Sequence, residues 1–359
     1  MKIGVLGAGQ LGRMLALAGI PMGHEFVFFD DTPEPCAAGL GQVDSLASPG
    51  LHALDALTYE FENIESYVDR FQEFGIPIRP SPNALKAACD RLWEKDLLVE
   101  LGIPTPKYRE FVEAREFAKS NQEIGYPLIA KTRRFGYDGK GQVRLDGYED
   151  HERLWEMAGE EPMILESVVP FDRELSIIAA RCADGKVAIY PLVENHHRNG
   201  ILRLTIAPAP NLTPELQGAA EAYARKVLEQ FDYVGVIAIE LFQVGTELLV
   251  NEIAPRVHNS GHWTLDGAET SQFENHIRAI TDMPLGSTLA RGYSAMINIF
   301  GERPDPAAVL AVPGAHYHVY GKSARPGRKI GHITVGAADR ETLAERVAAL
   351  RYDDLPVLP

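Results

Sequence analysis

KTRRFGYDGKGQ, residues 131–142, is the segment that decides the fold class of this chain. Its glycines surround Tyr137, Asp138 and Lys140, so the segment is rich in backbone donors and can close over a polyphosphate. Lys131 ends the apolar run PLIA, which predicts an ammonium emerging from a strand into a cleft. The alternative is a surface hairpin with solvated charges. We favour the phosphate-binding interpretation because so much positive charge beside an apolar strand is unusual in an acidic protein.

The composition predicts a folded protein with more than one domain. At 359 residues the chain exceeds what one hydrophobic core supports, and its 45% hydrophobic and 24% charged residues are ordinary for a globular protein. The net charge of −15 argues against a nucleic-acid partner. We expect no membrane partner and a cytoplasmic location, since no apolar run is long enough to span a bilayer, MKIGVLGAGQ lacks signal-peptide anatomy, and three scattered cysteines form no disulfide framework.

The first 82 residues read as a βαβ unit, that is, a Rossmann-like α/β domain. Its strand KIGVLG leads into the turn GAGQLG, in which Gly7, Gly9 and Gly12 have the spacing of a dinucleotide fingerprint. Taken alone, this turn favours a nicotinamide-dependent oxidoreductase. The alternatives are a plain tight turn or another anion at the helix N-terminus. No later segment offers an obvious second nucleotide half.

Residues 83–275 change character to an α+β pattern. A helix is expected from Ser81 and Pro82 to Gly102, with an apolar stripe at Leu85, Ala88, Leu92 and Val99. Strands follow at YPLIAKT, PMILESVV, ELSIIAAR and KVAIYPLV, then the amphipathic helix PELQGAAEAYARKVLEQF with Leu216, Ala220, Tyr223, Val227 and Phe231 on one side. Residues 276–359, with AMINIFG, HYHVYG and KIGHITVG, are predicted to form a smaller β-rich domain.

The runs VGVIAIELF and ELLVNEI predict an antiparallel hairpin that carries Glu240 and Glu252. With the turn centred at 246, the two carboxylates face each other across the ladder, and like charges so placed repel unless a cation lies between them. Hard oxygen ligands point to Mg²⁺, with Asn251 as a further oxygen. If the register is shifted by one residue, the pair becomes a harmless solvated edge.

Two polar loops follow the hairpin, and together they suggest a second anion site. APRVHNSGHWT, 254–264, is dense in polar side chains without periodicity, and YGKSARPGRKIGH, 320–332, is a cationic glycine turn suited to a phosphate monoester. Each loop alone could be a charged surface turn. His196 and His197 are adjacent and point to opposite faces of a strand, so at most one is expected to be functional.

In this order the segments closely resemble the N5-carboxyaminoimidazole ribonucleotide synthetase family, ATP-grasp enzymes of microbial purine biosynthesis. The resemblance covers nearly the whole chain and rests on GAGQLGRM, TYEFENI, KTRRFGYDGKGQ, ESVVPFDRELSIIAAR, ENHHRNGIL, VGVIAIELF, NEIAPRVHNSGHWT and RPGRKIGH. It implies an N-terminal pre-ATP-grasp domain at 1–82, an ATP-grasp domain at 83–275 with ATP between two lobes, and the small β-rich domain at 276–359. A homodimer is expected from the resemblance alone.

The resemblance also implies roles for individual residues. The ATP contacts would be Arg91, Lys131, Gly136, Tyr137, Asp138, Gly139, Lys140, Gly141, Gln142, Glu166, Ser167, Val168, Val169, Glu174, His197, Asn251 and Glu252. The ribonucleotide contacts would be Gln10, Leu11, Tyr137, Asp138, Lys140, Arg256, His258, Asn259, Ser260, Lys322, Arg328 and Lys329. Glu240 and Glu252 would hold Mg²⁺. Asp138, Lys140, Arg256 and His258 would be the catalytic set, and which residue transfers the proton is left open.

The implied reaction joins bicarbonate to the exocyclic amine of 5-aminoimidazole ribonucleotide, with ATP hydrolysed to ADP and phosphate through carboxyphosphate. Two positions depart from the family pattern: Phe135 stands where many relatives have glycine, and Val257 replaces a proline. The competing hypotheses are another ATP-grasp ligase or transformylase that uses formate or an amino acid, the nicotinamide-dependent oxidoreductase, and a non-catalytic nucleotide sensor. The oxidoreductase leaves the glycine loop and the carboxylate pair unexplained.

Overall fold

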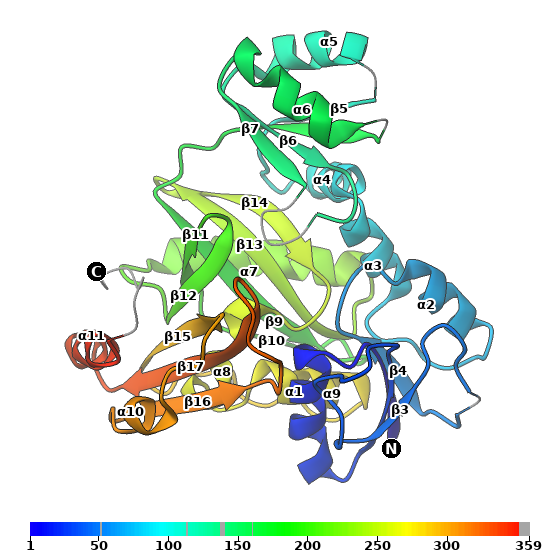
Figure 1. Cartoon of the computed structure of the whole chain (residues 1–359), viewed down its shortest axis with the longest axis vertical. Helices are drawn as coiled ribbons and strands as arrows, with labels where there is room; N and C mark the ends of the chain where they lie inside the picture. Colours follow the sequence, from blue (N-terminus) through cyan, green and yellow to red (C-terminus); the bar gives the residue numbers. More distant parts are fainter. Residues whose placement is uncertain (51, 113, 137–140, 160, 352–359) are drawn as a thin grey trace.

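The chain is arranged as a large central sheet with a smaller lobe above it and an N-terminal sheet beside it (Figure 1). The computed structural model describes residues 1–50, 52–112, 114–136, 141–159 and 161–351. Tyr137, Asp138, Gly139 and Lys140, the centre of the predicted glycine loop, therefore lie outside the described residues. Within those ranges, the helices are all too short or too polar to cross a membrane.

The N-terminal βαβ prediction is confirmed. The strand order is β3-β2-β1-β4, and all neighbours are parallel. Leu57 of the last strand also bridges Ile78, so the sheet ends near the predicted proline cluster. The elements are β1 (Lys2–Leu6), α1 (Gln10–Gly19), β2 (Glu25–Phe29), β3 (Gln42–Asp44), β4 (Ala56–Tyr59) and α2 (Glu65–Gln72).

The upper lobe is an antiparallel sheet covered by two helices (Figure 1). Phe111 of the sheet packs edge-on against Phe117 and Trp155 of the helices, which closes a small apolar core of its own. The strand order is β5-β8-β6-β7. The elements are β5 (Tyr108–Phe111), α5 (Ala114–Ile124), β6 (Leu128–Thr132), β7 (Gln142–Leu145), α6 (His151–Ala158) and β8 (Met163–Ser167).

The central sheet runs in the order β14-β13-β9-β11-β12-β15-β17-β16, with β10 paired to β9. The C-terminal strands were predicted as part of a smaller domain, yet they extend this same sheet through the pairing of β12 with β15. Its strands are β9 (Arg173–Arg181), β10 (Val187–Ile189), β11 (Val193–Arg198), β12 (Ile201–Ala207), β13 (Gly235–Val244), β14 (Glu247–Ala254), β15 (Tyr293–Phe300), β16 (Ala315–Val319) and β17 (Lys329–Ala337). KVAIYPLV, predicted as one strand, contributes to both β10 and β11.

Helices cover both faces of this sheet. The amphipathic helix α7 (Pro214–Gln230) packs Leu216, Ala220 and Val227 on one face as predicted, whereas Tyr223 and Phe231 are only partly buried. α1 and α9 (Gln272–Ile280) lie side by side on the other face, and α9 spans the domain boundary predicted after residue 275. The remaining helices are α8 (Thr264–Gly267), α10 (Pro306–Leu310) and α11 (Arg340–Ala349).

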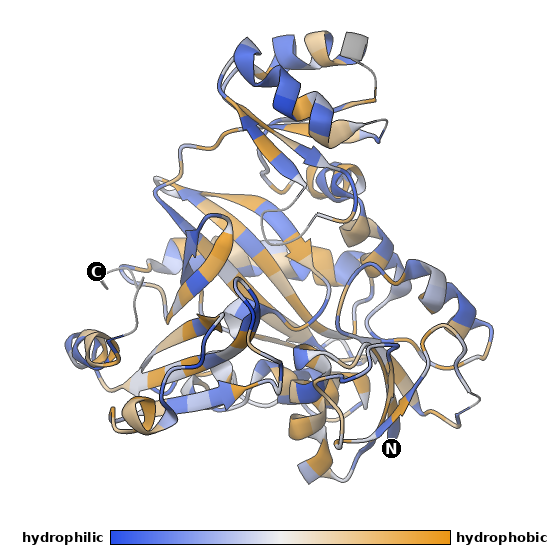
Figure 2. Ribbon diagram, in the orientation of Figure 1, coloured by the Kyte–Doolittle hydropathy of each residue, from blue (hydrophilic) through white to orange (hydrophobic). Residues whose placement is uncertain are grey.

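One face of the sheet changes from apolar to polar along its strands. Ile178 and Ala238 pack against α1 and α9, whereas Ser176 and Glu240, two residues along on the same face, are polar. Figure 2 shows apolar strands at the centre of the fold with polar segments among them. The strand register places six polar residues on this face, and we call them the polar stripe: Glu252, Glu240, Ser176, Glu174, Asn195 and Thr205.

The single helix predicted from Ser81 to Gly102 is wrong, because Asp90 divides it into α3 (Pro82–Cys89) and α4 (Arg91–Glu100). Asp90 has extended backbone, and its carboxylate accepts the Leu92 N–H at 3.1 Å as an N-cap. The predicted stripe fails beyond this break, since Val99 is 57% exposed. The buried positions of α4 are instead Glu94, Lys95 and Leu98.

Removing the Asp90 carboxylate should destabilise the fold strongly. Its side chain is buried and also binds Arg133 at 2.6 Å and Arg134 at 3.4 Å, so Asp90→Ala should lower the free energy of unfolding by about 2–4 kcal/mol. Burial alone raises the pKa of Asp90, but Arg133 lowers it more, and the net shift is downward. The difference should therefore be full at pH 7 and shrink below about pH 4.

Urea unfolding at several pH values measures this loss. The exposed Glu100→Ala on the same helix is the control and should stay within about 0.5 kcal/mol of the parent. Equal stability of the Asp90→Ala protein and the control at pH 7 would contradict the capping role.

Candidate active site

The Glu240–Glu252 pair is confirmed as directly opposed across the β13–β14 ladder. The turn is shorter than predicted, because Val244 pairs with Glu247, and this register continued would set Glu240 against Asn251. A β-bulge next to Glu240 inserts Asn251 as an extra residue and so restores the pairing with Glu252. The opposition of the two carboxylates therefore depends on one irregularity in the hairpin.

The pair is electrostatically strained and suits a hard cation. Burial and then Glu252 raise the pKa of Glu240 to about 7. Burial also acts to raise the pKa of Glu252, but Arg91, whose Nη1 lies 3.2 Å from Glu252 Oε2, brings it below its ordinary value. Asn251 Oδ1, beside them, is buried and has no hydrogen-bond partner among the residues that the structure describes. Two carboxylates with an orphaned amide oxygen fit Mg²⁺, which commonly takes its other ligands from phosphates and water.

The described residues contain no cluster of three or more His, Cys, Asp or Glu side chains able to hold a metal by themselves. Water or the oxygens of a bound molecule would complete the coordination of a cation at Glu240 and Glu252, and phosphate oxygens are ligands that Mg²⁺ commonly takes.

Two buried charges on α4 hold the bulge, and both were missed in the sequence. Lys95 Nζ donates to the Asn251 carbonyl at 2.6 Å, and Glu94 Oε1 accepts the Ile253 N–H at 2.6 Å. These backbone groups lie on the outer edge of β14, where no further strand can pair with them. The available signal was helical spacing, because Arg91, Glu94 and Lys95 lie within one turn and face the same edge.

Lys131 lies at the end of β6 as predicted, although its ammonium is buried and paired. Its Nζ lies 2.8 Å from Glu166 Oε2, and Lys95 Nζ lies 3.9 Å from Glu166 Oε1. Burial acts to raise the pKa of Glu166, but Lys131 and Lys95 outweigh it and lower the pKa to about 2. A carboxylate held ionised between two ammonium groups forms a rigid link from the upper lobe to α4.

The segment after Glu166 crosses from the upper lobe to the central sheet. The Ser167 N–H donates to the Lys107 carbonyl at 2.9 Å, and the Val168 N–H donates to the Pro127 carbonyl at 3.3 Å. Val169 follows them as a partly buried residue. Ser167, Val168 and Val169 thus line the connection between lobes, where the resemblance implies ATP contacts.

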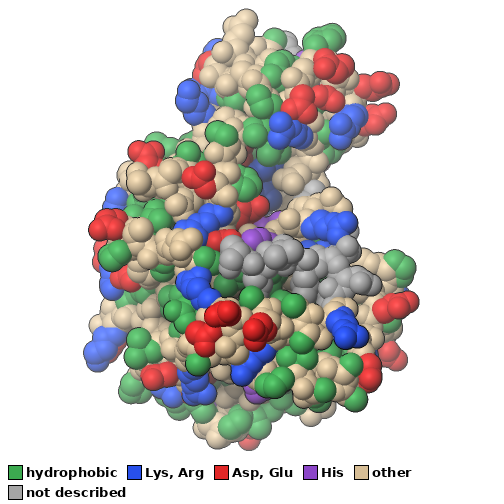
Figure 3. Space-filling view, turned by 90° about the vertical axis from the view of Figure 1, so that its left-hand side faces the viewer, with side chains coloured by type: hydrophobic (Ala, Val, Ile, Leu, Met, Phe, Trp, Pro, Cys, Tyr) green, Lys and Arg blue, Asp and Glu red, His purple; other side chains and the backbone are tan. Residues whose placement is uncertain are grey.

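The described ends of the glycine loop lie beside Lys131. Gln142 pairs with Lys131 across β6 and β7, and Gly141 has a φ of +70°, a left-handed conformation that favours glycine. Phe135 also has a positive φ of 63°, which accounts for the glycine expected at this position in relatives. Gly136 is partly buried next to it. Figure 3 shows a recess between the upper lobe and the body where basic, acidic and histidine side chains gather.

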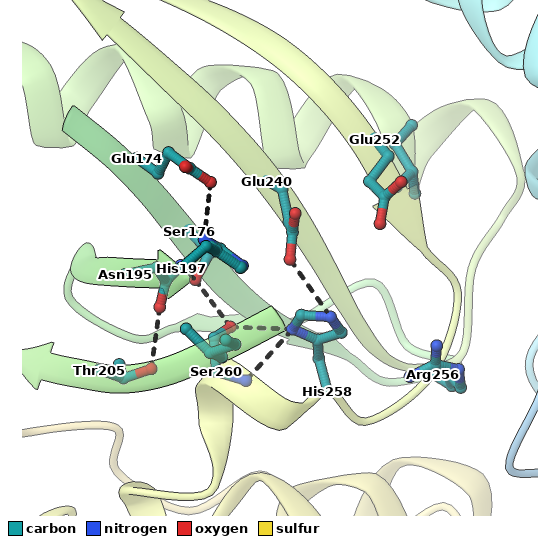
Figure 4. Close-up of polar contacts among 12 residues, drawn as sticks. Glu174, Ser176, Asn195, His197, Thr205, Glu240, Glu252, Arg256, His258 and Ser260 are labelled. Carbon is teal, nitrogen blue, oxygen red and sulfur yellow. Dashed lines mark hydrogen bonds and ion pairs between the residues drawn. The ribbon is translucent and has the colours of Figure 1, made fainter. Parts of the chain in front are cut away.

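The structure distinguishes the two adjacent histidines. His197 Nδ1 lies 2.7 Å from Glu174 Oε2 next to the polar stripe, and burial is outweighed by Glu174 and Glu240 so that the pKa of His197 rises (Figure 4). His196 Nε2 instead lies 3.1 Å from Glu194. The two histidines are consecutive on β11 and point to opposite faces as predicted, while the register shift beside them leaves Arg203 of β12 as the extra residue. His197 is therefore the histidine that joins the carboxylate cluster.

His258 reaches the carboxylate pair from the loop after β14. Its Nε2 lies 3.4 Å from Glu240 Oε1, and its Nδ1 lies 2.9 Å from the Ser260 hydroxyl (Figure 4). Burial, followed by Arg256, lowers the pKa of His258 to about 3. Ser260 was predicted as a substrate contact, but its side chain is fully buried and its hydroxyl is already hydrogen-bonded to Ser176 at 2.7 Å. Asn259 Oδ1, in contrast, is buried and accepts no hydrogen bond from the described part of the chain.

The N- and C-terminal regions meet at the other end of the site. Lys322 Nζ binds Gln10 Oε1, which joins the cationic turn to the start of α1. Arg256 Nη2 lies 2.7 Å from Glu62 of the TYEFENI segment. Three predicted ribonucleotide contacts are less direct: Leu11 is buried in the apolar core, Arg328 binds Ser323 of its own turn at 2.8 Å, and Lys329 acts on His258 by helping to lower its pKa.

GAGQLG is a helix N-terminus at which two of the N–H donors are already used. The Gly9 N–H donates to Glu60 Oε1, and the Gly12 N–H donates to Glu60 Oε2 at 2.8 Å. A Cβ on Gly7 would lie 2.6 Å from Glu60, so the glycine is needed for close approach of this side chain. The buried Glu60 carboxylate takes the place that a dinucleotide pyrophosphate would require, which argues against the nicotinamide hypothesis.

Comparison with known families agrees with this arrangement. Residues 1–89 match the ribonucleotide synthetase preATP-grasp domain, residues 96–273 the ATP-grasp domain, and residues 294–346 the phosphoribosylaminoimidazole carboxylase C-terminal domain. The fold and the paired carboxylates at the lobe junction therefore define an ATP-grasp ligase with a pre-ATP-grasp domain.

Full-length relatives identify the family. An N5-carboxyaminoimidazole ribonucleotide synthase of Pseudomonas aeruginosa is 47% identical over 97% of this chain and 98% of its own. The crystal structure of the synthetase from Thermus thermophilus has a TM-score of 0.94 at 49% identity, covering 99% of both chains. An Aspergillus clavatus synthase in complex with ADP and 5-aminoimidazole ribonucleotide has a TM-score of 0.86 at 31% identity, covering 98% of both. The chain belongs to the N5-carboxyaminoimidazole ribonucleotide synthase family.

Replacing Lys95 should weaken nucleotide binding, because it removes a hydrogen bond that holds the β-bulge in place. Lys95→Met keeps the length of the side chain but removes the donor to the Asn251 carbonyl and one of the two cations at Glu166, so we expect the KM for ATP to rise by about 10-fold or more. Steady-state kinetics at saturating Mg²⁺ measure the KM for ATP of the variant and the parent.

Lys226→Met is the matched control, because Lys226 also donates to a backbone carbonyl, that of Leu101 at 2.9 Å, but from an exposed position on α7. It should leave the KM unchanged. An unaltered KM in a well-folded Lys95→Met protein would show that the bulge holds its shape without the α4 ammonium.

Proposed function

We propose that the chain catalyses the ATP-dependent joining of bicarbonate to the exocyclic amine of 5-aminoimidazole ribonucleotide, with ADP and phosphate as the other products. The observation that carries the proposal is the opposition of Glu240 and Glu252 beside Lys131 at the junction of the lobes. The names of the relatives support the choice of substrate, since the chain matches them over nearly their whole length. Such a reaction serves purine biosynthesis.

The carboxylate side of the site would activate bicarbonate. Bicarbonate is a poor electrophile, so its phosphorylation by ATP to carboxyphosphate is the step that needs charge stabilisation. Mg²⁺, when held by Glu240 and Glu252, would neutralise phosphate charge there. Arg91, which lies against Glu252, and Lys131 would supply fixed positive charge to the same phosphates. Their pairing with acidic residues holds both in place before ATP arrives.

The loop side of the site would hold the ribonucleotide. Arg256 Nε and Asn259 Oδ1 are buried polar atoms without partners in the described ranges, which suits these residues to contact the substrate. The cationic turn with Lys322, Arg328 and Lys329 would take the phosphate monoester, with Gln10 nearby. Tyr137, Asp138 and Lys140 remain proposed contacts on the glycine loop, which would exclude water from the labile carboxyphosphate.

The three-domain division, a homodimer and a cytoplasmic location complete the proposal. They are supported by the resemblance and by the composition of the chain. Sedimentation velocity of the purified protein measures the oligomeric state directly.

Product analysis tests the reaction. With ATP, bicarbonate and 5-aminoimidazole ribonucleotide, we expect phosphate release that requires bicarbonate and rises by at least about 100-fold with the ribonucleotide, because the intermediate is used only when the amine is present. Carbon-13 NMR with labelled bicarbonate should show the new carbamate.

Substituting formate or amino acids for bicarbonate separates the other ATP-grasp reactions, and an NADH titration tests the oxidoreductase. Phosphate release indifferent to both bicarbonate and the ribonucleotide, or an NADH binding signal without one for ATP, would refute the proposal.

Glu252→Gln tests the proposed metal pair. The amide keeps the shape but lacks the charge, so turnover should fall by more than about 100-fold while the circular dichroism spectrum and unfolding temperature stay near those of the parent. Glu247→Gln, an exposed position on the same strand, is the matched control and should retain activity. Retained Mg²⁺-dependent turnover in Glu252→Gln would remove Glu252 from the metal site.

A further inference from the structure

A continuous chain of buried hydrogen bonds runs across the polar stripe to His258 (Figure 4). Thr205 Oγ1 lies 2.9 Å from Asn195 Oδ1, and Asn195 Nδ2 lies 2.9 Å from Ser176 Oγ. Ser176 Oγ lies 2.7 Å from Ser260 Oγ, which lies 2.9 Å from His258 Nδ1. Its first three members come from β12, β11 and β9, three neighbouring strands, so the sheet itself fixes their spacing.

The donors in this chain point in one direction. Thr205 donates to the Asn195 amide oxygen, and the amide nitrogen donates to Ser176. The Ser176 hydroxyl hydrogen is then left for Ser260, and that of Ser260 for His258 Nδ1. The Ser260 backbone N–H also donates to Nδ1, at 3.3 Å, and this donor does not depend on any hydroxyl orientation. His258 Nδ1 is therefore an acceptor.

An acceptor at Nδ1 places the hydrogen of the neutral imidazole on Nε2. Nε2 is the atom that faces the carboxylate pair, 3.4 Å from Glu240 Oε1. His258 thus offers an N–H donor to the site, whereas a general base there would need a free lone pair on the same atom.

We propose that Ser176, Asn195 and Thr205 are positioning residues that act through Ser260 to hold His258 as a hydrogen-bond donor toward the reacting anion. This inference rests on the proposed function: the anion is the bicarbonate group before and after its transfer to the amine. The proton of the amine is then taken by a group other than His258. The sequence had left open whether His258 transfers this proton, and the hydrogen-bond direction removes it from that role.

Stability alone does not explain the chain. Ser176, Asn195 and Thr205 are at most 5% exposed and lie on a sheet face that is apolar only two residues away, at Ile178. Replacing both partners of a buried hydrogen bond by apolar side chains of similar shape is nearly neutral for stability, so an apolar stripe would serve the fold as well. A fully satisfied network instead fixes the geometry of the group at its end.

Nitrogen-15 NMR of the full chain labelled with ¹⁵N-histidine tests the tautomer directly. His258 is assigned from the signal that is missing in His258→Gln. We expect the pattern of Nε2–H and unprotonated Nδ1 in the parent. In Ser176→Ala the Ser260 backbone N–H still donates to Nδ1, so we expect a shift of the Nδ1 signal with the same tautomer. The opposite tautomer in the parent overturns the proposal. Because this readout needs no turnover, it remains decisive if the proposed reaction fails.

Kinetics test the positioning role. Ser176→Ala and Asn195→Leu should each lower kcat by about 10-fold with the KM for ATP within about twofold, and the double variant should be no worse than the single ones. Thr205→Val, at the far end of the chain of hydrogen bonds, should lower kcat by about 2-fold to 3-fold. Ser176→Cys keeps a weak donor and should recover part of the loss.

Asn298→Ala is the control: Asn298 is equally buried in the same sheet, and its Nδ2 donates to the Leu202 carbonyl at 3.0 Å, outside the chain. It should leave kcat and the His258 spectrum unchanged. The proposal is overturned if the losses in kcat multiply in the double variant, or if Asn298→Ala loses as much kcat. Either result means that these residues act only through general packing. If Ser176→Ala does not fold, Ser176→Cys and Thr205→Val decide by the same measures.

Discussion

The repulsion between Glu240 and Glu252 is the constraint on which the rest of the site depends. Two carboxylates opposed across a ladder are costly, and burial together with the charge of Glu252 raises the pKa of Glu240. The hairpin alone would avoid the pair, because its short turn sets Glu240 against Asn251. The bulge restores the opposition, so the chain maintains a repulsive arrangement that a cation bound between the carboxylates would relieve.

This arrangement requires support from outside the hairpin. Because β14 is an edge strand, the bulge would leave backbone groups unpaired, and the buried charges Glu94 and Lys95 of α4 satisfy them. Lys95 also approaches Glu166, which holds Lys131 of the upper lobe. The proposed metal pair and Lys131, the proposed phosphate-binding lysine, are thus connected through a single helix. A change of position of the upper lobe would reach Glu252 through α4.

The sequence predicted the parts of the site that follow from local pattern. Alternation and turn chemistry located the hairpin, and with it the carboxylate pair, while the glycine loop and the order of motifs indicated the family. The features that could not be predicted are the break between two helices and the contacts between residues far apart in the sequence. Asp90 divides α3 from α4 because Arg133 and Arg134 bind its carboxylate, and neither contact is visible from periodicity. The burial of Glu94 and Lys95 was missed for the same reason.

The turn GAGQLG shows how a tertiary contact changes the meaning of a motif. Its glycine spacing is that of a dinucleotide site, and the free N–H groups of α1 would bind a pyrophosphate if nothing else reached them. Glu60, 48 residues beyond Gly12, fills that position with a carboxylate. The helix N-terminus then serves to anchor the TYEFENI segment, from which Glu62 reaches Arg256. The same geometry that would bind a cofactor instead fixes one wall of the proposed ribonucleotide site, and it does so because the anion is supplied by the chain itself.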